Sequence, residues 1–427
     1  MKKNRLFILF FLASFFVSAQ DLIKSYSHLD GYSIIPKLVL ERQNDIVVPY
    51  YITKGDEKKA GILFLDKAFN INDAILFEGE GAYVINDLKE SLNGNLLVSA
   101  EGYSPQNQES IYFIELKGKE IVNEFIFNEN GNEVDPFSII EVDNHVIFGG
   151  FVKIRKLIGN SFYNIYSEDQ MMYISRFTKD GEKQWSNAID LDGYNQEICN
   201  KVVFLNNNLF LLSHAHEIDG NISPFLVKMN TKGEFIKMIK LSNKDNIIGI
   251  SDLVSHNNQL LISGTYKDNN TEYYYNAKIS ENLVINDANS FILPSRIVLS
   301  DSYIYNDTKH VYGTLFTDNN SYNYLFMKDY ISKVEYQQSG TPRMDYLIGQ
   351  YDNKFIGYSS GNNNDYRADI VVLKNIISDP VTLEEAPSFL LESSNFTKYN
   401  IITDFDVSSV NSGCKQIYLK NIKNKIK

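Results

Sequence analysis

A pair of short apolar segments that recurs roughly every 50 residues constrains this chain more than any other feature. One pair reads NLLVSAEGYS at Asn95–Ser104 and SIYFIELK at Ser110–Lys117, and a tight turn at Gly118 leads into a further apolar run, Val122–Phe127. The first segments of such pairs begin near Asp45, Asn95, His145, Asn208, Gln259, His310 and Lys354. A regular recurrence of this kind indicates a repeat architecture.

The residues between the apolar segments predict hairpins. Asn, Asp or Gly precedes most of the first segments, and these residues tolerate the positive φ that tight hairpins need. Four of the second segments lead through a turn into another strand, at Gly118, Gly181, Gly233 and Asn282. The apolar segments are short and nearly continuous, as expected of strands buried on both faces. Each unit therefore plausibly holds four antiparallel strands.

Seven such units predict an all-β fold, a β-propeller of about seven four-stranded blades. Packing the sheets radially buries faces that no single sheet hides alone. An open β-solenoid or two sandwiches is the alternative architecture. Either Asp21–Asp30 or Asn400–Val407 is available to complete the last sheet. The expected blades span approximately residues 34–81, 82–131, 136–193, 199–245, 248–295, 296–342 and 343–390, followed by a closing segment, 391–427.

The N-terminus predicts export. Basic residues at positions 2, 3 and 5 precede an apolar run, Leu6–Val17, and the small residues Ser18 and Ala19 suit a signal peptidase. We expect a signal peptide at 1–19 and a single mature domain at 20–427, located in the periplasm, at the cell surface or in the medium. No later apolar stretch approaches membrane-spanning length, so no integral membrane segment is expected after cleavage.

Charge and cysteine content restrict the partners. The formal net charge is −12, and removing three basic residues with the signal peptide leaves roughly −15 (−12 − 3). An acidic chain without a basic stripe is a poor nucleic-acid binder, so we expect no nucleic-acid partner. We also expect a monomer. Export permits a disulfide between Cys199 and Cys414, and two buried free thiols are an equal alternative.

Two turn sequences carry a resemblance to known proteins. RFTKDGEKQW at Arg176–Trp185 and KMNTKGEFI at Lys228–Ile236 resemble the Lys-x-Asp-x-x-Gly-x-x-x-Trp repeats of secreted bacterial β-propellers, a group that includes quinoprotein-like propellers. The resemblance implies a propeller and covers roughly residues 34–380. Quinone-dependent members repeat a docking Trp in most blades. This chain has only Trp185, with Val122 at the matching place in the second unit, so we predict no cofactor.

Topology places the longer loops on one face of the expected propeller, and binding sites on rigid scaffolds usually lie on such loops. The longest predicted loop is Lys153–Gln170. Aromatic rings there would stack on sugars or anchor a protein, since aromatic residues are enriched at interfaces. The predicted binding residues are Arg155, Phe162, Tyr163 and Tyr166. A self-packed surface loop is the alternative interpretation.

The sequence gives less support to the candidate metal ligands and catalytic acids than to the aromatic binding residues of the long loop. His214 and His216 lie two residues apart on one strand, so they share a side and suit a metal, but no third ligand is evident and a structural pair is favoured. Calcium remains an option at Asn/Asp clusters such as 268–270 and 362–365, which are better explained as turns. The acids expected near the axis or the loop face are Glu78, Glu80, Glu101, Asp135, Glu197 and Asp365, and a solvated acid or turn residue is favoured for each.

These observations predict an exported, non-enzymatic binding or scaffold propeller that recognises a protein or glycan partner through its long-loop face. The alternative is a propeller enzyme, a glycan hydrolase or lyase or a peptidase-like protein, with catalytic acids in the central funnel. No Gly-x-Ser-x-Gly elbow, phosphate loop or zinc-protease helix is present, so the catalytic residues of such an enzyme are unknown. Acids converging at the axis would favour the enzyme.

Overall fold

The computed structural model covers residues 1–427, and its described part is built from antiparallel strands, with no α-helix in it. The described residues are 22–79, 82–103, 109–128, 133–157, 166–217, 220–243, 248–268, 271–293, 297–305, 308–316, 321–327, 330–334, 346–351, 354–359, 369–374, 381–382, 391–403, 408–410, 417–421, 423 and 426. The expected signal peptide lies outside them.

The strands of the first four blades follow one another in hairpin order. Blade 1 holds β2 (Ser33–Pro36), β4 (Ile46–Lys54), β5 (Glu57–Leu65) and β6 (Ile71–Gly79), with the short β3 (Leu40–Glu41) beside β4. Blade 2 holds β7 (Ala82–Glu90), β8 (Leu96–Tyr103), β9 (Glu109–Lys117) and β10 (Glu120–Asn128). Blade 3 holds β11 (Glu133–Val142), β12 (His145–Leu157), β13 (Tyr166–Thr178) and β14 (Lys183–Leu191). Blade 4 holds β15 (Tyr194–Leu205), β16 (Asn208–Glu217), β17 (Ile222–Asn230) and β18 (Phe235–Ser242).

The remaining three blades repeat the pattern. Blade 5 holds β19 (Ile248–His256), β20 (Gln259–Asp268), β21 (Thr271–Ile279) and β22 (Ile285–Ile292). Blade 6 holds β23 (Ile297–Tyr305), β24 (Thr308–Phe316), β25 (Ser321–Met327) and β26 (Tyr330–Val334). Blade 7 holds β27 (Tyr346–Tyr351), β28 (Lys354–Ser359) and β29 (Asp369–Lys374), and β1 (Leu22–Tyr26) is its fourth strand. The predicted all-β propeller of four-stranded blades is therefore confirmed.

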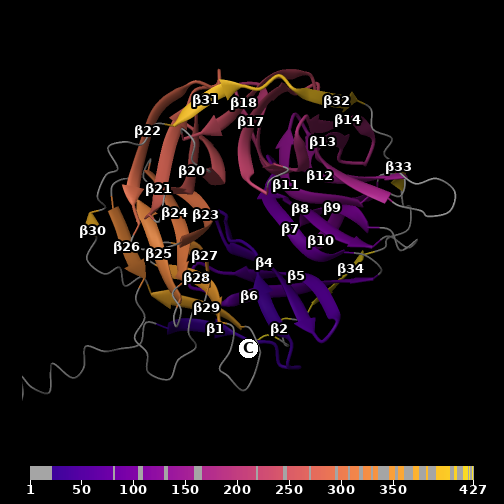
Figure 1. Ribbon diagram of the computed structural model, residues 1–427. Coiled ribbons are helices and arrows are strands. Elements are labelled where there is room, and N and C mark those ends of the chain that lie inside the picture. The colour runs from indigo at the N-terminus through magenta and orange to yellow at the C-terminus, as the bar shows by residue number, and fades with distance from the viewer. Residues whose placement is uncertain are drawn as a thin grey trace, which may run out of the picture.

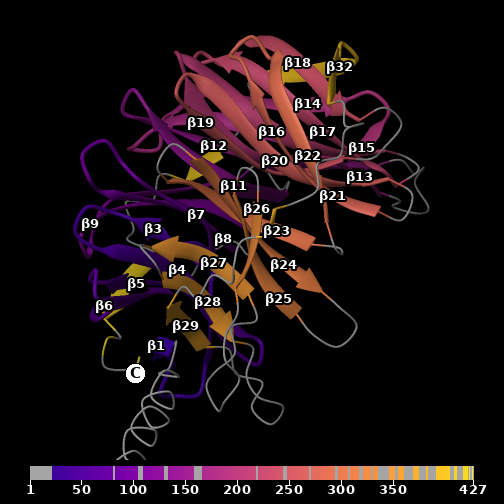
Figure 2. The same ribbon diagram turned by 90° about the vertical axis from the view of Figure 1, so that its left-hand side faces the viewer.

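The blades stand around a central axis as a wheel, with the first strand of each blade innermost (Figure 1). Figure 2 shows the same wheel after a quarter turn. Blades 3 and 4 also touch through a single parallel pair, Gln170 with Gln196, which links β13 to β15.

The ring is closed by the N-terminal strand. β1 pairs antiparallel with β29, so the first and last parts of the ring share one sheet. Of the two segments available for closure, the one at the N-terminus therefore completes the last blade. Tyr399–Thr403, within the other segment, pairs instead with β14 of blade 3.

The C-terminal part of the chain runs along the rim of the wheel, against the order of the blades (Figure 1). Its strands pair antiparallel with the outer strands of successive blades. They are β30 (Val381–Thr382) on β26, β31 (Glu392–Asn395) on β18, β32 (Tyr399–Thr403) on β14, β33 (Ser408–Val410) on β10 and β34 (Ile417–Asn421) on β6. The segment expected to close the ring is instead a rim belt, a name used below for β30–β34.

The hydrophobic core lies between neighbouring blades. One cluster of buried side chains joins blades 2 and 3, and its rings Phe113, Phe125, Phe127, Phe148 and Phe177 have centroids 4.6–6.3 Å apart. Similar clusters join blades 1 and 2, 3 and 4, 4 and 5, and 7 and 1. The sheets of blades 1 to 4 thus hide both apolar faces against their neighbours, which explains the continuous apolar segments of the sequence there.

The hairpin turns have the conformation that their residues predict. Both residues of Asp143-Asn144, Asn206-Asn207 and Asn257-Asn258 have positive φ, as type I′ turns require. Gly233 also has positive φ, and a Cβ there would lie 2.7 Å from the Trp185 ring of the preceding blade. The Trp185 indole nitrogen donates a hydrogen bond to the carbonyl of Thr231 at 3.1 Å. The repeat motif therefore joins blades 3 and 4.

Candidate functional site

The two ends of the wheel differ in the connections that they carry. The turns between first and second strands and between third and fourth strands share one end, which we call the turn face. The turns between second and third strands and the links between blades share the other end, the loop face.

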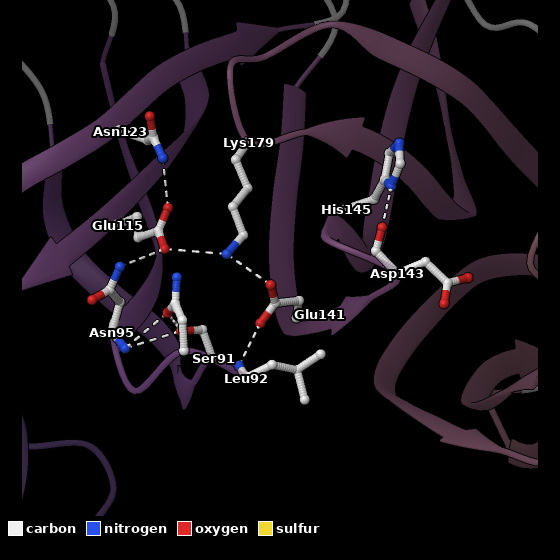
Figure 3. A network of polar contacts seen from close by, with 10 residues as sticks. Ser91, Leu92, Asn95, Glu115, Asn123, Glu141, Asp143, His145 and Lys179 are labelled. Atoms are coloured by element: carbon white, nitrogen blue, oxygen red, sulfur yellow. Dashed lines mark hydrogen bonds and ion pairs between the residues drawn. The ribbon is translucent and has the colours of Figure 1, made fainter.

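The turn face holds a buried network around Lys179, in the third turn of blade 3 (Figure 3). Its ammonium group contacts Glu115 of blade 2 at 3.1 Å and Glu141 of blade 3 at 2.7 Å. Asn95 and Asn123 donate hydrogen bonds to the Glu115 carboxylate at 2.8 and 2.6 Å. Burial acts to lower the pKa of Lys179, but its bonds to the two carboxylates outweigh that effect and raise it.

This network is better explained as a structural contact between blades than as a reactive site, because comparable contacts recur between other blades. Lys119 of blade 2 forms an ion pair with Asp73 of blade 1. Lys237 of blade 4 donates to the carbonyl of Asn282 in blade 5 at 3.1 Å. The turn face therefore holds neighbouring blades together.

The inner strands carry a repeated irregularity that the sequence analysis missed. Every inner strand from blade 2 to blade 7 has a one-residue β-bulge near its middle. The extra residue has no partner opposite it, so the strand twists and the side chain is re-aimed. The residues inserted at these bulges are Asn86, Phe137, Asn200, Ser251, Ser300 and Ile348.

Hydrogen bonds tie the bulges of blades 2, 3 and 4 to one another. The Asp87 carboxylate accepts a hydrogen bond from the backbone amide of Ile139 at 2.9 Å. The Ser138 hydroxyl accepts one from the amide of Val202 at 3.1 Å. Since each bond joins the residues just after two neighbouring bulges, these bulges lie side by side around the axis.

Exposure distinguishes the inserted residues from those that follow them. Phe137 is 39% exposed, whereas Ser138 is 1% exposed. Ser251 is also exposed, whereas Asp252 is 2% exposed. We call Asn86, Phe137, Asn200 and Ser251 the axial ring, because these inserted side chains lie on the innermost strands and are exposed or half-buried.

A second group of side chains, on the second strands, backs the axial ring. Asn86 donates to Glu101 at 2.8 Å, and the Phe137 ring lies 5.8 Å from that of Phe151. Lys37 of blade 1 also approaches Glu101. Burial lowers the pKa of Lys37 although its side chain reaches solvent, and the Glu101 charge counteracts that effect.

His214 occupies the same register position in blade 4. Its Nδ1 lies 2.6 Å from the Asn200 side-chain oxygen, and the ring also hydrogen-bonds the backbone of Ile250. Burial lowers the pKa of His214 to about 4, so the ring is neutral. In the described part of the chain, no three His, Cys, Asp or Glu side chains, His216 included, gather as metal ligands do.

On the loop face, the hairpin of β12 and β13 extends further than the described hairpins of neighbouring blades. Beyond the pair Phe151–Met172 it continues for six pairs, ending at Leu157–Tyr166. The hairpins of blades 2, 4 and 5 continue for only two or three pairs beyond the equivalent positions. The three or four extra pairs extend this hairpin by about 10–14 Å. We call residues 153–170 the arm.

The arm corrects the expectation of an irregular loop at Lys153–Gln170. Both ends of that segment are strands, because the backbone pairing of the blade continues outward. Arg155 lies opposite Glu168, and Tyr166 lies opposite Leu157. Phe162 and Tyr163, the other two predicted binding residues, lie outside the described residues.

Of the six acids expected near the axis, the four in the described part of the chain occupy different places in the wheel. Glu101 backs the axial ring, whereas Glu78 lies at the rim and pairs with Lys420 of the belt at 2.8 Å. Asp135 lies on inner strand β11, and residues 80 and 365 are outside the described part. Glu197 is fully buried on β15.

Glu197 nevertheless has an unusual environment. In the described structure neither of its carboxyl oxygens has a hydrogen-bond partner. Burial, with the charges of Asp190 and Asp169, raises its pKa to about 8. The backbone amides of Leu191 and of Glu197 itself act to lower this pKa, but their effect is smaller than that of burial. Neither amide has the geometry of a hydrogen bond to the carboxylate.

Cys199, two residues further along β15, is buried against Gly149 of blade 3. Its sulfur lies 3.7 Å from the carbonyl of Lys201. The proposed partner Cys414 is outside the described residues.

The fold and its faces thus define an all-β propeller with a projecting arm and a polar axial ring. No protein-family profile and no curated protein matches the chain. Among solved structures, it is similar to a subtype N10 neuraminidase-like protein of a little yellow-shouldered bat isolate, with 10% identity and a TM-score of 0.41 over 83% of this chain and 99% of that one.

A second similar structure is the Saccharomyces cerevisiae core factor. The identity is 11% and the TM-score 0.33, over 86% of this chain and 65% of that one. Likenesses this distant carry no functional argument, and the fold assignment rests on the strand pairing. No helix in the described residues is long and apolar enough to cross a membrane.

Proposed function

We propose that this protein is an exported, non-enzymatic binding or scaffold propeller that recognises a protein or glycan partner through its loop face. The arm is the observation that carries the proposal. A paired hairpin that extends beyond its neighbours offers partners a pre-ordered surface, so little conformational entropy is lost on binding. Export rests on the basic and apolar N-terminus of the sequence.

The base of the arm supports this role. Gln170 pairs with Gln196 of the next blade, and Lys153 lies opposite Gln170 and forms an ion pair with Glu133. The arm is therefore anchored to two inner strands at its base. A rigid base positions the outer residues, Arg155 and Tyr166 among them, for contact with a partner.

The arrangement of acids favours binding over the enzymatic alternative. Hydrolysis of a glycan uses two carboxyl groups that flank the scissile bond. Among the described side chains near the axis, Glu101 is engaged by Asn86, while Asp87 and Asp252 are bound by a backbone amide and by Lys201. These three carboxylates therefore have structural contacts that connect neighbouring strands and blades.

Shortening the arm tests the proposal. Replacing residues 154–169 with Asn-Gly would join Lys153 to Gln170, which already lie opposite each other, through a two-residue hairpin turn. The immobilised mature protein would be exposed to envelope proteins and to a polysaccharide panel. We expect the unaltered protein to retain one partner and the shortened variant to lose at least about tenfold in affinity for it.

Leu92→Ser is the matched control, because Leu92 is 86% exposed on the turn face, far from the arm. It should retain the partner as the unaltered protein does. Equal retention by the shortened variant, or no retained partner at all, would contradict the proposal. Turnover of any polysaccharide or peptide in the same panel would favour the enzyme instead.

A further inference from the structure

We infer that the axial ring binds the end of a neutral glycan chain, a site that deepens the proposed binding function and rests on it. The bulges place four side chains of different chemistry on the inner strands of four neighbouring blades: the amides of Asn86 and Asn200, the phenyl ring of Phe137 and the hydroxyl of Ser251. The hydrogen bonds between the first three bulges bring Phe137 between the two amides.

Phe137 is the central element of this site. Its ring is 39% exposed on an innermost strand, so part of its apolar surface is open to a ligand. Phe151 backs it, with ring centroids 5.8 Å apart. The open surface of the Phe137 ring is therefore held toward the axis, where the C–H face of a sugar ring would pack on it.

The flanking amides supply the polar half of the recognition. Asn86 is oriented by its bond to Glu101, and Asn200 by its contact with His214, so both amides are held in place. Each amide has a donor and an acceptor group, and one such bond leaves capacity for a ligand. Sugar hydroxyls both donate and accept, which matches fixed amides beside an aromatic platform.

The charges indicate a neutral ligand. None of the four ring side chains is ionised. The charged side chains beside the ring act on one another in pairs of opposite sign: Lys37 with Glu101, Lys153 with Glu133, and Lys201 with Asp252. A peptide is disfavoured as occupant, because peptide anchors are buried in clusters of apolar side chains and this ring offers one phenyl group.

The test uses the mature protein and defined soluble probes: linear neutral β- and α-linked glucans and a galactomannan. Retardation in native gels that contain each polysaccharide, followed by calorimetry with the matching hexasaccharide, gives the affinity. We expect at least one probe to bind. Phe137→Ala should lose about tenfold or more in affinity, and Asn86→Ala and Asn200→Ala should each weaken binding by a smaller factor.

Phe204→Ala is the matched control, since Phe204 is another partly exposed phenylalanine on an inner strand, next to the turn at Asn206-Asn207. It should bind as the unaltered protein does, and Phe137→Trp should retain binding because it keeps an aromatic face. Near-identical thermal unfolding of the variants would show that the fold is intact.

Failure of all the neutral probes, or equal binding by Phe137→Ala, would overturn the axial site. Binding of an anionic polysaccharide or a peptide pool in their place would overturn it as well. The arm-shortened variant separates the two proposals: it should still bind the hexasaccharide at the axial ring. If it does, while capture through the arm fails in every variant, the axial site stands and the arm proposal falls.

Discussion

Glu197 shows how a single residue can make stability depend on pH. In the unfolded chain its carboxyl group titrates near the ordinary value of 4.5, whereas burial raises the folded pKa to about 8. Between those values the folded state holds a proton that the unfolded state has released. The free energy of unfolding therefore falls as pH rises from about 4.5 to about 8, by at most about 1.4 kcal/mol per pH unit. Outside that window the contribution of this group does not change with pH.

Glu197→Gln should remove this dependence, because an amide of nearly the same shape does not titrate. The free energy of unfolding of the variant relative to the unaltered protein should therefore increase steadily between pH 5 and pH 8, as measured by urea denaturation. Asp30→Asn provides the control, since Asp30 is exposed. A difference between Glu197→Gln and the unaltered protein that is constant with pH would mean that Glu197 is ionised in the fold.

At the scale of elements, the contacts between blades depend on short turns. The third turn of blade 3 brings Lys179 to Glu115 and Glu141, and its Gly181 lies so close to Phe125 that a Cβ would meet that ring at 2.9 Å. Tight turns with glycine at positive φ let neighbouring blades approach closely. The turn therefore sets the spacing between blades 2 and 3.

Lys179→Met should be strongly destabilising, because it leaves two buried carboxylates without their cation. The expected loss is about 3–5 kcal/mol in the free energy of unfolding. Chemical denaturation would measure it. The double variant Glu115→Gln/Lys179→Met should recover part of the loss, and Lys59→Met, which removes a largely exposed pair with Glu57, should change little. A small effect of Lys179→Met would mean that water reaches the carboxylates of this network.

The wheel as a whole is completed by strands from both ends of the chain. β1 closes blade 7, and the rim belt covers the outer strands of blades 1, 2, 3, 4 and 6. Outer strands left bare present unpaired backbone groups that pair with other molecules. The belt thus makes these edges less available for association.

Truncation after residue 390 tests the role of the belt. Without β31–β34 the outer strands of four blades lose their antiparallel partners. We expect the truncated protein to associate into dimers and larger species, detected by light scattering after size-exclusion chromatography. Lys420→Ala, which removes only a surface ion pair with Glu78, should remain in the oligomeric state of the unaltered chain. A truncated protein that stays unassociated would show that the blades protect their own edges.

Local sequence predicted the units and their turns because those features depend on neighbouring residues. Continuous apolar segments such as Ile46–Tyr50 indicate strands buried on both faces, and Asn206-Asn207 indicates a type I′ turn. The polar residue in the middle of an apolar inner strand, as in Asn86-Asp87 and Ser251-Asp252, was a signal of the bulges that went unused.

The arm and its predicted binding residues show the limit of that approach. Lys153–Gln170 has the polar and aromatic composition of a loop, yet strand pairing continues to Leu157 and Tyr166 because the hairpin below it propagates outward. The position of Glu78 at the rim, away from the axis, depended on a belt strand more than three hundred residues away in sequence.

The chain by itself determined that its strands come in repeated hairpins with apolar faces, because periodicity and turn residues act over a few neighbours. Only the tertiary structure decided which terminus closes the ring, where the belt runs and which side chains meet at the axis. Those outcomes depend on pairing between distant strands, and backbone hydrogen bonds are nearly the same for many possible partners.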